Sequence, residues 1–127
     1  MTLFRGINVV SIAVPDLARA RDFYGNTLGL GTPVHDLPEA GWVEFSTGGS
    51  GGNLSITTEG FQPSSGQRTT VVLEVDDCRA AHATLKGRGV RCDEPVVFPG
   101  FVVFCSFQDP FGNQLQMCSP APGETRE

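Results

Sequence analysis

The sequence has few of the residues that most often bind metals or nucleic acids. It contains only two histidines, and nine Lys and Arg residues stand against fourteen Asp and Glu, which gives a net charge of −5. This balance disfavours a nucleic-acid partner, because phosphate binding needs a basic surface. No apolar run approaches the ~20 residues of a membrane span, and the first residues lack the basic and then apolar pattern of a secretory signal. We therefore expect a cytoplasmic protein with no nucleic-acid and no membrane partner.

The four cysteines are widely spaced and include no Cys-x-x-Cys pair. A disulfide framework has no support without signs of secretion, and a zinc site usually shows closer pairs. We expect Cys78, Cys92, Cys105 and Cys118 to be free thiols that are buried or half-buried.

The chain is long enough to form one folded domain with a hydrophobic core. It has 127 residues, of which 39% are hydrophobic and 18% are charged. A chain of this size hides roughly two-thirds of its unfolded surface. Sixteen glycines and nine prolines indicate many turns and therefore many short strands.

Two halves of the sequence show the same order of predicted elements, which is strand, helix, strand, strand, strand. Asp16 and Asp77 each stand where a helix N-cap is expected, and a shift of 61 positions places one on the other. Strands are predicted near 7–14, 30–34, 42–46, 53–58, 70–75, 90–97, 101–108 and 114–119, with helices after Asp16 and over 78–86. We divide the chain into a first module at 1–60, a linker at 61–69, a second module at 70–119 and a mobile tail at 120–127.

Alternation along the strands separates an apolar face from a mixed, polar face. Val10, Ile12, Leu54 and Ile56 lie on the apolar face, which a helix should cover. The opposite faces carry many uncharged polar groups, which suit a cleft for a small organic molecule. The alternative is a solvated sheet face whose Ser and Thr reflect strand propensity.

Two segments resemble the opening and the closing parts of the vicinal oxygen chelate superfamily. This group includes glyoxalases, extradiol dioxygenases, fosfomycin-resistance enzymes and bleomycin-binding proteins. The resemblance rests on residues 7–30, with Pro15-Asp16 and Phe23-Tyr24, and on residues 107–116, with Asp109-Pro110-Phe111-Gly112-Asn113. It implies an α+β fold of two βαβββ modules that form an open, curled, mixed sheet with a central cleft, the glyoxalase/bleomycin resistance/dioxygenase fold. It also implies a homodimer whose cleft lies at the dimer interface.

The resemblance also assigns the positions that hold a divalent ion in metal-dependent members. These positions fall on Val9, Ser55, Thr70 and Gln116 in this sequence. None of the four side chains is an imidazole, a carboxylate or a thiolate, which are the ligands that transition metals prefer. We therefore expect no metal at the family position and no cofactor.

Other side chains near the expected cleft could act as a general base or bind a relocated metal. Glu44 and Glu74 are strand carboxylates, and a buried one could act as a general base if burial raised its pKa. His35 is expected in a solvated loop, and His82 on a helix face away from the cleft. No catalytic residue is assigned, and the alternation leaves open which face of the third strand lines the cleft. The candidate ligand-binding residues are Val9, Ser11, Trp42, Glu44, Ser55, Thr57, Thr70, Glu74, Gln114 and Gln116.

Three functions fit these observations. The first is a metal-free protein that binds a small organic molecule, as bleomycin-binding proteins do. The second is a lyase, isomerase or dioxygenase that is metal-free or uses a relocated metal held by His35, Glu44, Glu74 or a cysteine. The third is an interaction subunit whose cleft is vestigial. The sequence does not decide whether the protein is an enzyme.

Overall fold

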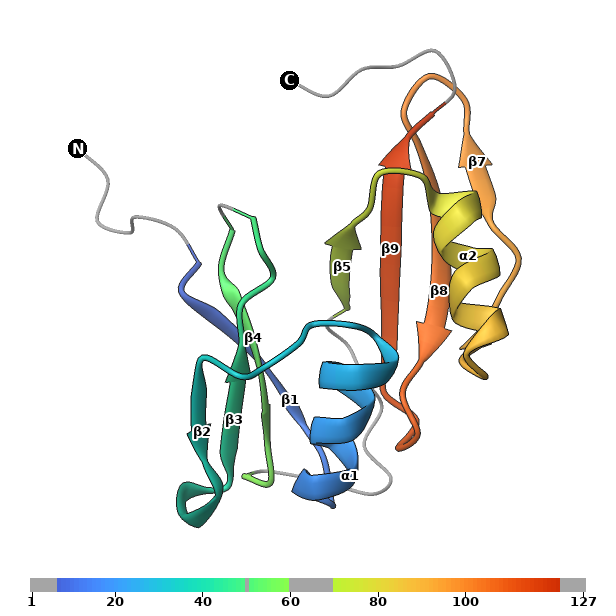
Figure 1. Cartoon of the computed structure of the whole chain (residues 1–127). Helices are drawn as coiled ribbons and strands as arrows, with labels where there is room; N and C mark the ends of the chain where they lie inside the picture. Colours follow the sequence, from blue (N-terminus) through green and yellow to red (C-terminus); the bar gives the residue numbers. More distant parts are fainter. Residues whose placement is uncertain (1–6, 50, 60–69, 122–127) are drawn as a thin grey trace, which may run out of the picture. The chain divides into compact units, whose positions relative to one another are not determined.

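A computed structural model describes residues 7–49, 51–59 and 70–121, which fall into two compact units, 1–65 and 66–127 (Figure 1). The predicted linker at 61–69 and residues 122–127 of the predicted tail lie outside the described residues. Each unit contains a mixed sheet and a helix, and each is described separately below.

The described residues of the first unit form four strands in the order β1-β4-β3-β2. β1 runs parallel to β4, and the other pairs are antiparallel. Its elements are β1 (Val9–Ala13), α1 (Leu17–Asp22), the π-helix η1 (Phe23–Thr27), β2 (His35–Leu37), the 3-10 helix η2 (Pro38–Ala40), β3 (Trp42–Phe45) and β4 (Asn53–Thr57).

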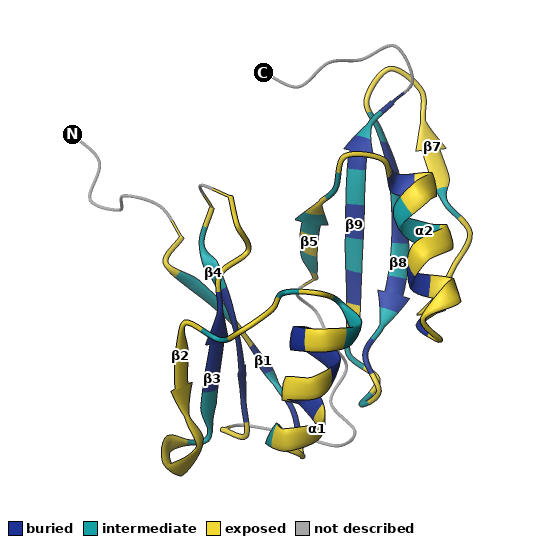
Figure 2. Cartoon of the chain, in the orientation of Figure 1, coloured by how far each residue is buried: buried dark blue, intermediate teal, exposed yellow. Residues whose placement is uncertain are grey.

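The helix of the first unit begins where the sequence predicts. The side chain of Asp16 accepts a hydrogen bond from the Arg19 amide at 3.1 Å, as an N-cap should. α1 continues into a π-helical segment, which the apolar spacing did not reveal. Ala20 and Tyr24 are fully buried, and contacts of α1 with β3 and β4 place this helix over one face of the sheet (Figure 2).

The strand expected near 30–34 is not present, and β2 begins at His35 instead. The reason is local. Gly29 and Gly31 adopt positive φ angles of 87° and 86°, and Pro33 has no amide hydrogen for a sheet. The backbone amides of this segment instead form hydrogen bonds with carbonyl groups at the end of the helix. Leu30 N, for example, donates to Tyr24 O at 3.1 Å.

The second unit has the strand order β5-β9-β8-β6, with β7 also paired to β8. β5 runs parallel to β9, and the remaining pairs are antiparallel. Its elements are β5 (Val71–Glu74), α2 (Cys78–Gly87), β6 (Arg91–Cys92), β7 (Val96–Phe98), β8 (Val102–Gln108) and β9 (Gln114–Pro120).

Two boundaries in the second unit differ from those predicted. The strand expected over 90–97 is divided into β6 and β7, because Pro95 interrupts the ladder between them. The first two residues of the predicted tail belong instead to the folded unit. Pro120 ends β9, and Ala121 is buried and donates its amide to Phe101 O at 3.2 Å.

The motif between β8 and β9 is a turn built around one buried carboxylate. Asp109 is 5% exposed and its Oδ1 accepts the amides of Phe111 at 2.9 Å and Asn113 at 2.8 Å. Gly112 takes the positive φ of 89° that the turn requires. The Asp-Pro-Phe-Gly-Asn motif is therefore explained by its role in forming the turn between β8 and β9.

The internal repeat extends to the pairing of the strands. Val10 pairs with Leu54 in the first unit, and Val71 pairs with Leu115 in the second, so both partners are shifted by 61 positions. Asp77 caps α2 as Asp16 caps α1. Two βαβββ modules of an α+β fold are thus present, with the third element of the second module divided in two.

Candidate functional site

Strand pairing decides which face of β3 carries the candidate residues. Glu44 pairs with Ser55, and Ser55 pairs with Ser11, so these three form one row across the sheet. In the next row Trp42 pairs with Thr57. Paired residues share a face, and α1 covers the opposite face.

Glu44 is the centre of a hydrogen-bonded cluster on this face. Its side chain is 8% exposed. Oε2 accepts the Asn53 Nδ2 at 2.7 Å, and Oε1 accepts the Trp42 Nε1 at 3.1 Å. The Asn53 amide, and to a smaller extent the Trp42 indole and the charge of His35, lower the pKa of Glu44 despite its burial.

This direction corrects one expectation for Glu44. A general base at neutral pH would need a raised pKa, but here hydrogen bonds to the charged form outweigh the cost of burial. Glu44 is a buried, ionised carboxylate, and its chemistry is that of a fixed negative charge.

Hydroxyl groups extend the polar row towards β1. Ser55 is fully buried, and its Oγ donates to Ser11 Oγ at 2.7 Å. Ser11 is exposed, and Val9 is half-buried one pleat away on the same strand. Thr57 is 5% exposed, and its Oγ1 accepts the Glu59 amide at 3.0 Å. The structure therefore brings the six first-unit candidates together on one sheet face.

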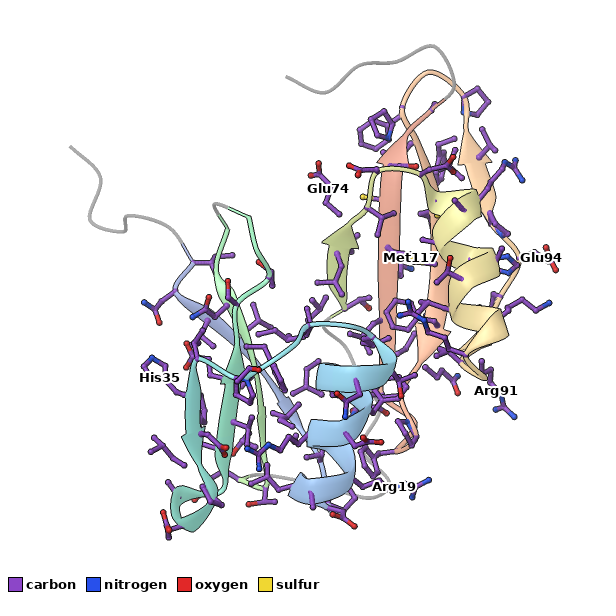
Figure 3. The ribbon with its side chains drawn as sticks, viewed as in Figure 1. Arg19, His35, Glu74, Arg91, Glu94 and Met117 are labelled. Carbon is purple, nitrogen blue, oxygen red and sulfur yellow. The ribbon has the colours of Figure 1, made fainter. Side chains whose placement is uncertain are left out.

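His35 lies in a strand, although the sequence suggested a loop. It is the first residue of β2 and is exposed (Figure 3). It pairs with Glu44 across the strands, so its position is on the same face. Its neighbour Asp36 faces the other side and forms an ion pair with Arg21 of α1.

Three of the four second-unit candidates, Glu74, Gln114 and Gln116, lie on one face of the other sheet. Gln116 is half-buried, and its Nε2 donates to Ser106 Oγ at 3.2 Å. Gln114 donates to the same oxygen at 3.5 Å. Thr70 directly precedes β5 and is exposed, and Glu74 ends β5 and is also exposed (Figure 3).

Sequence reasoning missed two polar partners in these clusters. Asn53 alternates with Ser55 and Thr57 and so shares their face, but only its contact with Glu44 reveals its role. The sequence does not identify Ser106, because alternation along β8 gives two faces and does not show which of them Gln116 shares. It pairs with Gln116, as Glu44 pairs with Ser55 in the first unit.

The described part of the chain shows no group of three His, Cys, Asp or Glu residues able to hold a metal ion. The four cysteines are free thiols, as expected. Among the described segments, no helix has the length and apolar character needed to cross a bilayer.

Solved structures with the same fold include three that are at least a quarter identical to this chain. TnmS3, an antibiotic binding protein from Streptomyces sp. CB03234, is 27% identical with a TM-score of 0.79, and the match covers 95% of this chain and 100% of that one. A glyoxalase/bleomycin resistance protein from the same strain is 29% identical with a TM-score of 0.70, over 87% and 98% of the two chains. A superfamily member from Sphaerobacter thermophilus DSM 20745 is 25% identical with a TM-score of 0.76, over 93% and 99%.

A search of functionally curated proteins gave no significant match. The family model of the glyoxalases, bleomycin resistance proteins and dioxygenases, however, matches residues 6–117, which is most of the chain. With the repeated βαβββ unit and the similar solved structures, this match shows that the chain belongs to the Glyoxalase/Bleomycin resistance protein/Dioxygenase superfamily.

Proposed function

We propose that this protein binds a small organic molecule on the polar sheet faces of its two modules and does so without the metal ion of its metal-dependent relatives. The observation that carries the proposal is the cluster of Trp42, Glu44 and Asn53 beside the hydroxyls of Ser55 and Ser11. A few fixed polar groups next to an aromatic surface are typical of small-molecule sites.

The residues at the family metal positions do not fit a transition metal. Val9 offers no donor atom, and the Ser55 hydroxyl already donates to Ser11. Thr70 has a neutral hydroxyl, and the Gln116 side chain is a neutral amide bonded to Ser106. Zinc, iron and manganese sites are built from imidazole, thiolate or carboxylate groups. We therefore derive no reaction step through a metal.

Similarity to an antibiotic binding protein supports binding as the function. TnmS3 shares 27% of its residues with this chain over its full length. At this level of identity the ligand itself does not carry over. The ligand candidates remain Val9, Ser11, Trp42, Glu44, Ser55 and Thr57 in the first unit, and Thr70, Glu74, Gln114 and Gln116 in the second.

We further propose that the protein acts as a homodimer whose binding cleft lies at the interface. Support comes from the superfamily, whose small members commonly dimerise. Light scattering coupled to size-exclusion chromatography measures the mass directly. A particle of twice 13.5 kDa is expected, and a monomer at all concentrations would contradict this part of the proposal.

The proposed function is tested on protein purified without an affinity tag. Elemental analysis should find no stoichiometric Zn, Fe, Mn or Ni. Titration with panels of aromatic natural products should change the fluorescence of Trp42, the only tryptophan in the chain. A stoichiometric metal that is lost in Glu44→Ala or Glu74→Ala would overturn the proposal in favour of an enzyme with a relocated metal site. Silent titrations across broad panels would overturn the binding function itself.

A further inference from the structure

Glu44 holds a negative charge that hydrogen bonds stabilise but do not neutralise. Both of its carboxylate oxygens accept from neutral donors, the Asn53 amide and the Trp42 indole. The residue is 8% exposed, so little water contacts the carboxylate directly. Burying a carboxylate without a counterion is costly, so a buried carboxylate that no cation pairs with is a candidate functional group.

No Lys or Arg side chain pairs with Glu44 within the described residues. The described arginines of the first unit are Arg19 and Arg21 on α1, and this helix covers the other face of the sheet. Figure 3 shows Arg19 extending from the helix away from the strands. His35 is the neighbouring group that can carry positive charge, but it is exposed, and no hydrogen bond or ion pair joins it to Glu44 in the part of the chain described.

Trp42 adds a second feature that favours cations. Its indole donates to Glu44, which fixes the ring beside the carboxylate on the same sheet face. The ring is half-buried and keeps part of its surface accessible. The face of an indole attracts organic cations through its quadrupole, and tryptophan does so best among the aromatic residues.

We propose that the Trp42–Glu44 pair recognises the positively charged group of an organic ligand, such as a planar aromatic cation, with the carboxylate supplying the counter-charge and the indole a flat contact surface. This inference rests on the proposed binding function and specifies its ligand class. An organic cation fits better than a metal ion, because both Glu44 oxygens are already engaged and the described residues place no group of three His, Cys, Asp or Glu side chains there.

The test compares three small aromatic probes of similar shape and different charge. These are 1-methylquinolinium (a cation), 1-methylnaphthalene (neutral) and 1-naphthoate (an anion), each titrated while Trp42 fluorescence is followed. The cation should bind about tenfold or more tightly than the neutral probe, because charge-assisted contacts are the stronger kind. The anion should bind most weakly. Mn²⁺ is titrated separately as a metal probe.

Glu44→Gln removes the charge and keeps the size of the side chain. We expect it to lose the preference for the cation while affinity for the neutral probe changes little. Glu39→Gln is the matched control, since Glu39 is exposed in η2 and its substitution gives the same net charge. Cation binding should be unchanged in Glu39→Gln. Circular dichroism and thermal unfolding verify that both variants fold. If Glu44→Gln does not fold, Asn53→Ala is tested in its place, because it removes one hydrogen-bond donor to Glu44 and keeps the charge.

The outcomes separate this inference from the proposed function. Equal binding of the cation and the neutral probe, or equal losses in Glu44→Gln and Glu39→Gln, would overturn the cation preference and leave small-molecule binding intact. Mn²⁺ binding that depends on Glu44, without binding of 1-methylquinolinium, would also overturn it. Failure of all three aromatic probes to bind, together with silent ligand panels, would count against the proposed function as well.

Discussion

Single side chains on the two sheets carry opposite electrostatic roles. Glu44 is buried but ionised, because the Asn53 amide and the Trp42 indole favour its charged form. Cys105 is buried and neutral. Its Sγ lies 3.0 Å from Asp93 O, and burial, with smaller contributions from nearby groups such as Cys92, raises the pKa of this thiol to about 12. Burial disfavours the charged form of both groups. At Glu44 hydrogen bonds to the carboxylate outweigh this effect, whereas at Cys105 burial keeps the thiol neutral.

The neutral state of Cys105 predicts a loss of stability in alkaline solution. The unfolded thiol ionises near its ordinary pKa of 9.0, whereas the folded thiol keeps its proton up to about 12. Between these values the unfolded thiol loses its proton while the folded thiol keeps it, so a rise in pH favours the unfolded state. The free energy of unfolding should fall by up to ~1.4 kcal/mol per pH unit for one such thiol. Urea denaturation from pH 8 to pH 11 measures it.

Cys105→Ala provides the comparison for this alkaline effect. The variant should be less stable at neutral pH, because it loses buried side-chain volume, but its stability should fall less steeply above pH 9. Identical slopes in the two proteins would show that other groups cause the alkaline loss. Cys78 and Cys92, whose pKa values burial also raises, would be tested next in the same way.

Helix caps show how the repeated module is built at the scale of an element. Asp16 accepts one backbone amide, from Arg19, whereas Asp77 accepts two, from Arg79 at 3.0 Å and Ala80 at 3.1 Å. In each module the cap follows the first strand and sets where the helix begins. The second cap should contribute more, because it satisfies more of the free amides at a helix start.

Asp77→Ala should therefore destabilise the protein by about 1 kcal/mol, and Asp16→Ala by no more than that. Asp77→Asn should retain most of the stability, since asparagine is also a good N-cap. Urea unfolding followed by far-ultraviolet circular dichroism measures all three. If Asp77→Asn lost as much as Asp77→Ala, the charge at this position and not the cap would be responsible.

The build of each module was predictable from the sequence to the extent that it repeats in the other module. The 61-residue shift, the two caps and the alternation in the parallel strand pairs could be read from the sequence, and Val10–Leu54 and Val71–Leu115 confirm them. The face of β3 could not be read, because alternation gives two faces and only pairing with Ser55 shows which one Glu44 shares. The start of β2 at His35 depends on glycine conformations that local propensity does not reveal.

Net charge offers a competing source of cation preference at the molecular scale. The chain carries −5, and a diffuse negative surface would also attract cations. The dependence of binding on salt distinguishes the overall charge from Glu44, since solution ions screen exposed charges over about 10 Å at 0.1 M but screen buried charges much less. Binding of 1-methylquinolinium should therefore weaken by less than about threefold when NaCl is raised from ~0.05 to ~0.5 M. A much larger loss, shared by Glu44→Gln, would assign the preference to the overall charge and leave Glu44 with a structural role alone.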